Sequence, residues 1–275
     1  MDEKYKPSLT EKELGAHISA LGVKKANILG WQQSLLGVLA GLYIAFGAHI
    51  YLVALAGGMG KLVGGAVFSV GLVLIILAGA ELFTGNVIMI IGGISGLYPK
   101  RKILKNWMVV YCANFAGAAL TAVLVWQSGL AGEIGQLTAV GETVSKVAEA
   151  KLGLSFTEAF IRGIFCNILV ILAVLMAAMA KDAISKILCI ILPIMTFVAC
   201  GFEHCIANMY LITLGLLAEG ASAWELLRIF GNLVPVTLGN VVGGIFILLI
   251  HPNRIRQLKM LYSRKKEEGK PNSRE

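Results

Sequence analysis

The sequence is short of charge: Asp, Glu, Lys and Arg together make up 15% of its 275 residues, whereas hydrophobic residues make up 57%. Soluble globular domains carry about 25% charged residues, so this composition excludes an ordinary soluble domain. It favours a chain that crosses a membrane several times, and the mean hydropathy of +0.79 agrees. The 32 glycines also fit, because small residues let membrane helices approach closely.

The sequence also lacks the residue groupings that enzyme and metal sites need. It has no metal-ligand spacing, nucleophile elbow or phosphate loop, so we expect neither an enzyme nor a bound metal or cofactor. The five cysteines lie in apolar segments, and their odd number does not suit a disulfide framework. The net charge of +8 comes mainly from the termini and one loop, so we expect no nucleic-acid partner.

Long charge-free runs predict the membrane spans, because about 20 apolar helical residues cross a bilayer. Charge-free runs predict spans 1, 3 and 6 at residues 32–60, 106–132 and 229–253, and a largely apolar run that contains Glu158 and Arg162 predicts span 4 at residues 156–180. Two other apolar regions, residues 62–99 and 187–218, are interrupted by Glu81 and by Glu203-His204. Each of these regions is either two spans or one broken span.

The placement of Lys and Arg favours one broken span in each interrupted region, and therefore six spans. With six spans, most of the basic residues lie on the side that holds both termini. The positive-inside rule identifies that side as the cytoplasm. With eight spans, the internal loops would reverse this bias.

The polar segments divide the chain further. Thr10 and Glu13 have the spacing of a capping box, followed by apolar residues at helical spacing. This predicts a short amphipathic helix, although a solvated leader remains an alternative. We expect five parts: an amino-terminal amphipathic cytoplasmic segment, a first repeat, an extracytoplasmic loop, a second repeat and a basic cytoplasmic tail, at residues 1–28, 29–132, 133–154, 155–253 and 254–275.

Matching motifs indicate that the two halves are repeats. ELFTGN at residues 81–86 and EHCIAN at residues 203–208 share E-x-x-x-[GA]-N, 122 residues apart. An N-x-x-G motif and a single glycine recur 126 residues apart, as Asn114 and Asn240 and as Gly37 and Gly163. Each half has three spans, so the second half enters the bilayer from the opposite side. In such inverted repeats the broken helices meet near the midplane and form the site, and helix amino ends attract anions there.

The polar residues of the two breaks have different expected roles. His204 lies alone in an apolar region, which marks a transport path or a proton site; a structural hydrogen-bonding role is the alternative. We expect Glu81 and Glu203 to be structural and to accept backbone N–H groups at the breaks, because a carboxylate would repel a permeating anion. Asn86 and Asn208 have the residue type of helix caps.

These motifs together resemble those of the formate/nitrite transporter family, which includes formate, nitrite and hydrosulfide channels. The motifs are ELFTGN, GFEHCIAN, Lys151 before span 4, Asn167 within it and NLVPVTLGN at the start of span 6. The resemblance covers about residues 20–252. It implies an all-α membrane protein with an aquaporin-like plan of six transmembrane helices in two inverted three-helix repeats, with helices 2 and 5 broken. It also implies a homopentamer with one pore per protomer, in the inner membrane of a prokaryotic cell.

The resemblance also implies roles for single residues. His204 would be the central pore histidine, with Thr84 and Asn167 beside it and Lys151 near the outer vestibule; an ordinary interfacial lysine is the alternative for Lys151. Apolar constrictions would be formed on the inner side by Leu82 and Phe197, and nearer the outside by Phe68 and Leu72. Arg162 and His49 receive no role.

We therefore expect a channel or transporter for small monovalent anions of weak acids: formate, nitrite or hydrosulfide. A bare anion meets a large desolvation penalty between apolar constrictions, and transient protonation at His204 would remove it, because an imidazole titrates near about 6.5. The alternative is an aquaglyceroporin-like pore for small neutral solutes. The paired Asn-Pro-Ala boxes typical of such pores are absent from the sequence.

Overall fold

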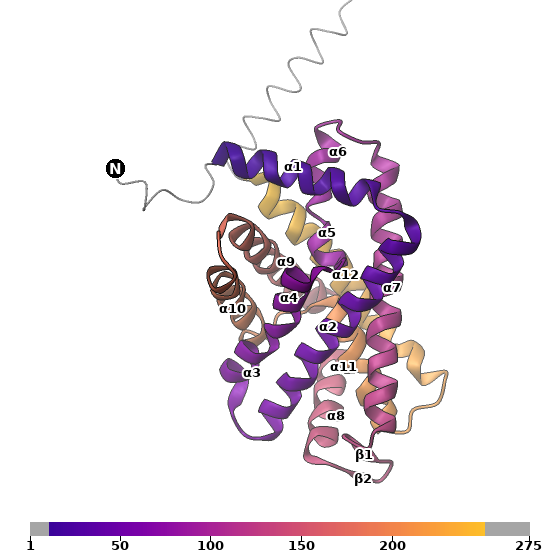
Figure 1. Cartoon of the computed structure of the whole chain (residues 1–275). Helices are drawn as coiled ribbons and strands as arrows, with labels where there is room; N and C mark the ends of the chain where they lie inside the picture. Colours follow the sequence, from indigo (N-terminus) through magenta and orange to yellow (C-terminus); the bar gives the residue numbers. More distant parts are fainter. Residues whose placement is uncertain (1–10, 251–275) are drawn as a thin grey trace, which may run out of the picture.

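The structure, a computed structural model, describes residues 11–250 and is almost entirely helical (Figure 1). Helix α1 (Glu11–Asn27) is the short amino-terminal helix that the sequence predicts. Its expected cap, Thr10, and the expected basic tail at residues 254–275 lie outside the described residues.

Five helical segments of the described chain are long and apolar enough to cross a membrane. They are α2 (Gly30–Ala56), the run of α3 (Gly60–Phe68), α4 (Val70–Leu74) and the π-helix η2 (Ile75–Gly79), α7 (Lys100–Gln127), α9 (Phe156–Met179), and the run of η3 (Glu225–Arg228) and α12 (Ile229–Ile250). Shorter helices complete the bundle: α5 (Phe83–Asn86), α6 (Met89–Ile94), α10 (Ala183–Ala199) and α11 (Cys205–Ala218).

The chain leaves helical geometry at both positions where the sequence is interrupted. Helix η2 ends at Gly79, with φ +84°, and an extended segment leads to α5. The turn after α10 contains Gly201, with φ +72°, and an extended segment leads to α11. A positive φ is easy for glycine and costly for other residues, so glycine allows each helix to stop sharply inside the bundle.

The long helices pack in two pairs, α2 with α7 and α9 with α12. Each pair meets backbone to backbone. A Cβ on Gly117 would collide with the carbonyl of Val38, and a Cβ on Gly243 would collide with that of Ile164. Close packing at small residues is how membrane helices associate without a hydrophobic driving force.

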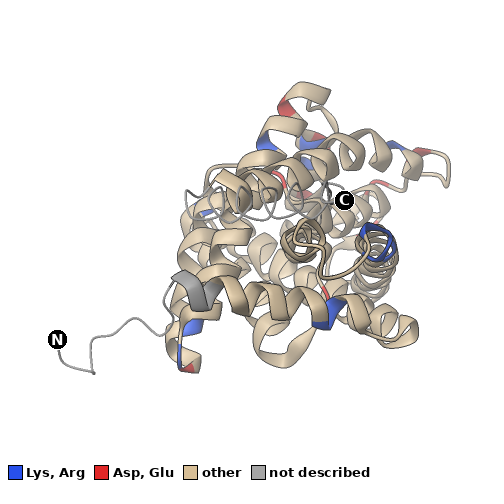
Figure 2. Cartoon of the chain, turned by 90° about the horizontal axis from the view of Figure 1, so that it is seen from above, with Lys and Arg blue, Asp and Glu red and all other residues tan. Residues whose placement is uncertain are grey.

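The two ends of the bundle are covered by different segments, and we name the ends after them. Helix α1 lies across one end beside α6, the α1 end; α8 (Ala139–Leu152) and the hairpin of β1 (Gly132–Glu133) and β2 (Gln136–Leu137) lie at the other, the α8 end (Figure 1). Viewed along the bundle, most of the ribbon carries no charged residue (Figure 2). Large apolar side chains cover the outer faces of the long helices, as a lipid environment requires.

The segment 133–154, expected as a polar loop, is mostly helix α8. The Thr138 hydroxyl accepts the Gly141 N–H at 3.2 Å and starts the helix. Val144 and Ala148, four residues apart, are buried and pack against Gly215 of α11. Charged residues such as Glu142, Lys146 and Glu149 give this segment the polar composition of a loop, although its apolar face packs against the core.

Candidate functional site

The break before α11 holds His204 in a single orientation. Its Nδ1 accepts the Ala207 N–H at 3.2 Å, which caps α11. The proton of the neutral ring therefore lies on Nε2, and Nε2 faces the hydroxyl oxygen of Thr84 at 2.9 Å. Thr84 lies on α5, directly after the other break, so side chains from the two breaks meet. Both are buried.

Glu203, next to His204, lies in a closed polar network. Its two carboxylate oxygens accept from the Lys151 ammonium at 2.9 and 3.0 Å. The Asn208 amide donates to Glu203 at 2.6 Å and to the Asn232 side chain at 2.7 Å. Asn232 in turn donates to the backbone carbonyl of Lys151 at 2.8 Å. The network fixes α8, α11 and α12 to the break.

The first break has the same network. Glu81 accepts from Lys25 of α1 at 2.8 Å. Asn86 donates to Glu81 at 2.7 Å and to Asn106 at 2.9 Å, and Asn106 donates to the Lys25 carbonyl at 3.5 Å. The roles of Lys25, Asn106 and Asn232 were not predicted from the sequence. The repeat offset of 126 residues also relates Lys25 to Lys151 and Asn106 to Asn232, and this offset is the sequence signal that points to them.

These contacts change the expected roles of four residues. The two glutamates do lie at the breaks, but their partners are Lys and Asn side chains instead of backbone N–H groups. Asn86 and Asn208 are not caps, because they lie inside α5 and α11 and donate to the glutamates. Among the breaks' own polar side chains, the capping function falls to His204.

Asn240 pairs the backbone groups that the second break leaves open. Its side-chain oxygen accepts the Cys205 N–H at 2.9 Å, and its amide donates to the carbonyls of Gly163 and Glu203 at 2.8 and 2.9 Å. Asn114 makes the equivalent three bonds at the first break, with Phe83, Gly37 and Glu81. Irregular backbone within a membrane is stable only when such partners are supplied.

Asn167 lies beside the His204–Thr84 pair. Its amide donates to the carbonyl of Asn240 at 2.6 Å and to that of Thr84 at 3.3 Å. Its buried side-chain oxygen has no hydrogen-bond partner within the described residues. Asn167 therefore links α9, α12 and α5 and keeps one acceptor free.

A narrow cavity of about 10 Å³ separates two larger vestibules. His204 and all four expected constriction residues line it, namely Phe68, Leu72, Leu82 and Phe197. The vestibule at the α8 end holds about 380 Å³ and the vestibule at the α1 end about 570 Å³. The structure thus brings the expected constriction residues together around the histidine.

The sides of two constriction residues differ from the expectation. We expected Phe197 to lie with Leu82 and Leu72 with Phe68. In the structure the rings of Phe197 and Phe68 pack edge to face, with their centroids 5.7 Å apart, and both line the α8-end vestibule. Leu72 and Leu82 line the α1-end vestibule. The reason is that α3–α4 and α10 enter the bundle from opposite ends and run antiparallel. Phe197, near the end of α10, therefore lies beside Phe68, which comes before Leu72 in the chain.

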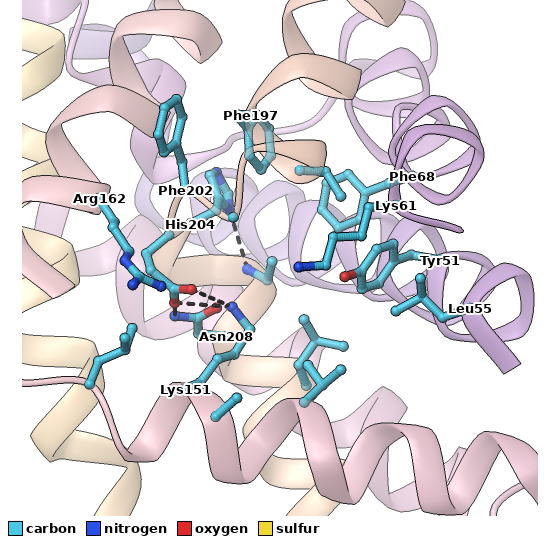
Figure 3. A pocket seen from close by; sticks show the side chains of 18 of the residues that line it. Tyr51, Leu55, Lys61, Phe68, Lys151, Arg162, Phe197, Phe202, His204 and Asn208 are labelled. Carbon is cyan, nitrogen blue, oxygen red and sulfur yellow. Dashed lines mark hydrogen bonds and ion pairs between the residues drawn. The ribbon is translucent and has the colours of Figure 1, made fainter. Parts of the chain in front are cut away.

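The α8-end vestibule opens directly onto His204 (Figure 3). Lys151 lies in its wall, and Glu203 compensates its charge. Lys61, Lys146 and Arg162 also line this vestibule. Within residues 11–250, no cluster of three or more His, Cys, Asp or Glu side chains could hold a metal ion.

Comparisons with known proteins agree with these features. The chain matches the formate/nitrite transporter family model over residues 12–252. It is 36% identical over 261 residues to formate channel FocA of Haemophilus influenzae. This alignment covers 86% of this chain and 91% of that protein. It is 35% identical to FocA of Escherichia coli K12, over 81% of this chain and 86% of that one.

Two solved structures have the same fold. One, described as an FNT family ion channel, superposes with a TM-score of 0.78 at 27% identity, over 90% of this chain and 99% of its own. The other, described as a pentameric formate channel with formate bound, superposes with a TM-score of 0.73 at 33% identity. The match covers 83% of this chain and 98% of that one. These relatives are named as channels and transporters, not enzymes. The chain belongs to the formate/nitrite transporter family of membrane proteins.

Proposed function

We propose that this protein is a channel for small monovalent anions of weak acids, with formate as its main substrate. The observation that carries the proposal is that His204, paired with Thr84, lines a narrow apolar cavity between two open vestibules. The relatives named as formate channels support formate as substrate. Nitrite and hydrosulfide, conjugate bases of weak acids of similar size, belong to the same proposal.

The proposed architecture has six spans in two inverted repeats, residues 29–132 and 155–253. The segments α3 to α6 form broken span 2, and α10 with α11 form broken span 5. The recurrence of both polar networks at offsets of 122 and 126 residues supports this assignment. The basic residues around α1 and at the start of α7 support a cytoplasmic α1 end in a prokaryotic inner membrane. A homopentamer follows the pentameric relative.

The proposed passage of an anion begins with loss of its water at the Phe68–Phe197 constriction. The His204 Nε2–H and the Thr84 hydroxyl then replace part of the hydration shell. Neutral His204 donates a hydrogen bond but has no spare proton, because Nδ1 is occupied by the Ala207 N–H.

If His204 protonates the anion, the ring must therefore first obtain an additional proton. It must take this proton at Nδ1 from a hydronium ion in a vestibule, which leaves as water, and this protonation breaks the Ala207 bond. The imidazolium then gives its Nε2 proton to the anion, which leaves as the neutral acid. The ring remains neutral with its proton on Nδ1, and must change tautomer before the next cycle. We propose that this step makes transport proton-linked at low external pH.

Reconstituted vesicles test the proposal. Wild-type vesicles are expected to take up formate, nitrite and hydrosulfide faster as external pH falls, and glycerol no faster than protein-free vesicles. Faster glycerol uptake with no anion uptake would favour the neutral-solute pore instead. His204→Ala is expected to lower the anion rate and flatten its pH dependence; if both stay unchanged, the role of the histidine is wrong.

A further inference from the structure

The charges around the α8-end vestibule are not equivalent. Four basic side chains line it: Lys61, Lys146, Lys151 and Arg162. Lys151 is bound by both oxygens of Glu203, so its charge is compensated inside the wall. Lys146 is largely exposed and lies 3.9 Å from Glu142. The positive charge that a permeating anion meets in this vestibule therefore comes from Lys61, Lys146 and Arg162, and among these lining residues Arg162 is the one guanidinium.

Arg162 combines a fixed backbone with an uncommitted side chain. Its carbonyl accepts the Glu203 N–H at 3.2 Å, which anchors it to the break. Among the described residues, the one carboxylate within ion-pair distance of its guanidinium is Glu158, at 3.9 Å. Glu158 is already held by the N–H and hydroxyl of Ser155 at 2.9 and 2.7 Å. Figure 3 shows Arg162 in the vestibule wall beside the Lys151–Asn208 group.

The first break shows that the guanidinium is not needed to build such a break. There, the Glu81 N–H donates to the carbonyl of Leu36 at 3.1 Å, as the Glu203 N–H does to Arg162. Leu36 lines the opposite vestibule and has no charge. Since a leucine supports the same backbone bond, the arginine side chain is available for a task that only the α8-end vestibule performs.

We propose that Arg162 is a specificity-determining residue that captures planar two-oxygen anions at the α8-end mouth and presents them to His204. A guanidinium binds two oxygens of one carboxylate with parallel N–H donors, whereas an ammonium acts as a point charge. Formate and nitrite offer two oxygens, and hydrosulfide offers one sulfur. The side chain is 43% exposed, so binding is weak enough for release, as conduction requires. The inference rests on the proposed anion transport.

Two substitutions separate the charge of Arg162 from its shape. Arg162→Lys keeps the charge and loses the fork; Arg162→Gln loses both. In vesicles at low ionic strength, Arg162→Lys is expected to raise the half-saturating formate concentration about three- to tenfold, with hydrosulfide changed less than twofold. Arg162→Gln is expected to weaken both anions, and the maximal rates to stay near wild type.

Arg228→Gln is the matched control. Arg228 ends η3 at the α8 end but does not line the vestibule, so its loss is expected to change neither anion. The proposal is overturned if Arg162→Lys keeps the wild-type half-saturation for formate, or if it weakens formate and hydrosulfide equally.

A binding measurement separates this proposal from the proposed function. Formate is expected to raise the thermal unfolding midpoint of wild-type protein in detergent at lower concentrations than it does for either Arg162 variant. If wild type binds formate in this Arg162-dependent way but transports none, the proposed function falls and the capture site stands. If wild type transports formate while both variants keep its transport half-saturation and its binding curve, the capture site falls and the function stands.

Discussion

The two helix breaks share their scaffold and differ in their chemistry. At each break a glycine ends the helix, a glutamate pairs with a lysine from an end helix, and two asparagines complete the network. Four polar residues around the central cavity do not recur. His204 occupies the position of Leu82, Asn167 that of Gly41 and Arg162 that of Leu36, while Thr84 of the first break has Ile206 as its counterpart.

This difference separates structural residues from functional ones. Residues required to keep broken backbone and buried charge in a membrane must appear at both breaks, because both breaks face the same physical cost. A polar side chain present at one break alone is not part of this shared scaffold, even where, like His204, it also caps a helix. All four unmatched polar residues lie along the path from the α8-end vestibule to the central cavity or directly beside it.

The largest expected effects come from breaking the shared scaffold. Glu203→Gln leaves the buried Lys151 ammonium without its counter-charge, which costs about 3–5 kcal/mol of stability for a buried pair. Glu81→Gln is expected to cost a similar amount through Lys25, and thermal unfolding in detergent measures both. Adding Lys151→Met to Glu203→Gln should recover part of the loss. A large effect at one break with none at the other would show that the two networks are not equivalent.

Replacing the unmatched histidine is expected to have the next largest effect, on transport rather than stability. His204→Leu gives the second break the residue of the first. It removes a desolvated donor to the anion, so formate uptake should fall about 10- to 100-fold, measured by stopped-flow light scattering of vesicles. Leu82→Val, on the other side of the cavity, keeps an apolar wall and serves as the control. A fall of less than twofold in His204→Leu would remove the histidine from the transport path.

The sequence predicted the breaks because their signals are local. Glu81, Glu203 and His204 are the only Asp, Glu, Lys, Arg or His residues within two long apolar runs, and the repeat offset aligns the two breaks. The partner lysines were harder to find. Lys25 meets Glu81 from 56 residues away, on an end helix whose placement depends on packing against α6 and α7.

Two expectations differ from the structure because they depend on tertiary packing, which the order of residues alone does not reveal. The sides of Leu72 and Phe197 depend on how far each half-helix penetrates from its own end of the bundle. Segment 133–154 was expected to be a loop because charged residues such as Glu142, Lys146 and Glu149 alternate with its apolar ones. Its Val144 and Ala148 are buried only once α11 supplies Gly215 as their partner.

A smaller effect is expected at Thr84, which contributes the first break's side of the contact. Thr84→Val keeps the shape and removes the hydroxyl, so the His204 Nε2–H loses its partner. Formate uptake should fall about fivefold, the equivalent of one neutral hydrogen bond. Thr84→Ser keeps the hydroxyl and should stay within twofold of wild type. Equal rates in the valine and serine variants would mean that the hydroxyl takes no part in transport.

The smallest expected effect is at Lys146, an exposed cation of the same vestibule. Its pair with Glu142 is long, and both side chains are more than half exposed, so Lys146→Gln should leave stability within about 0.5 kcal/mol of wild type. Formate uptake at low salt should fall less than twofold, and the difference should vanish at high salt, because salt screens exposed charges. A loss that persisted at high salt would mean that Lys146 contacts the anion directly. In that case several cations would share the capture of anions at the α8-end mouth, and Arg162, whose counterpart at the first break is Leu36, would not act alone.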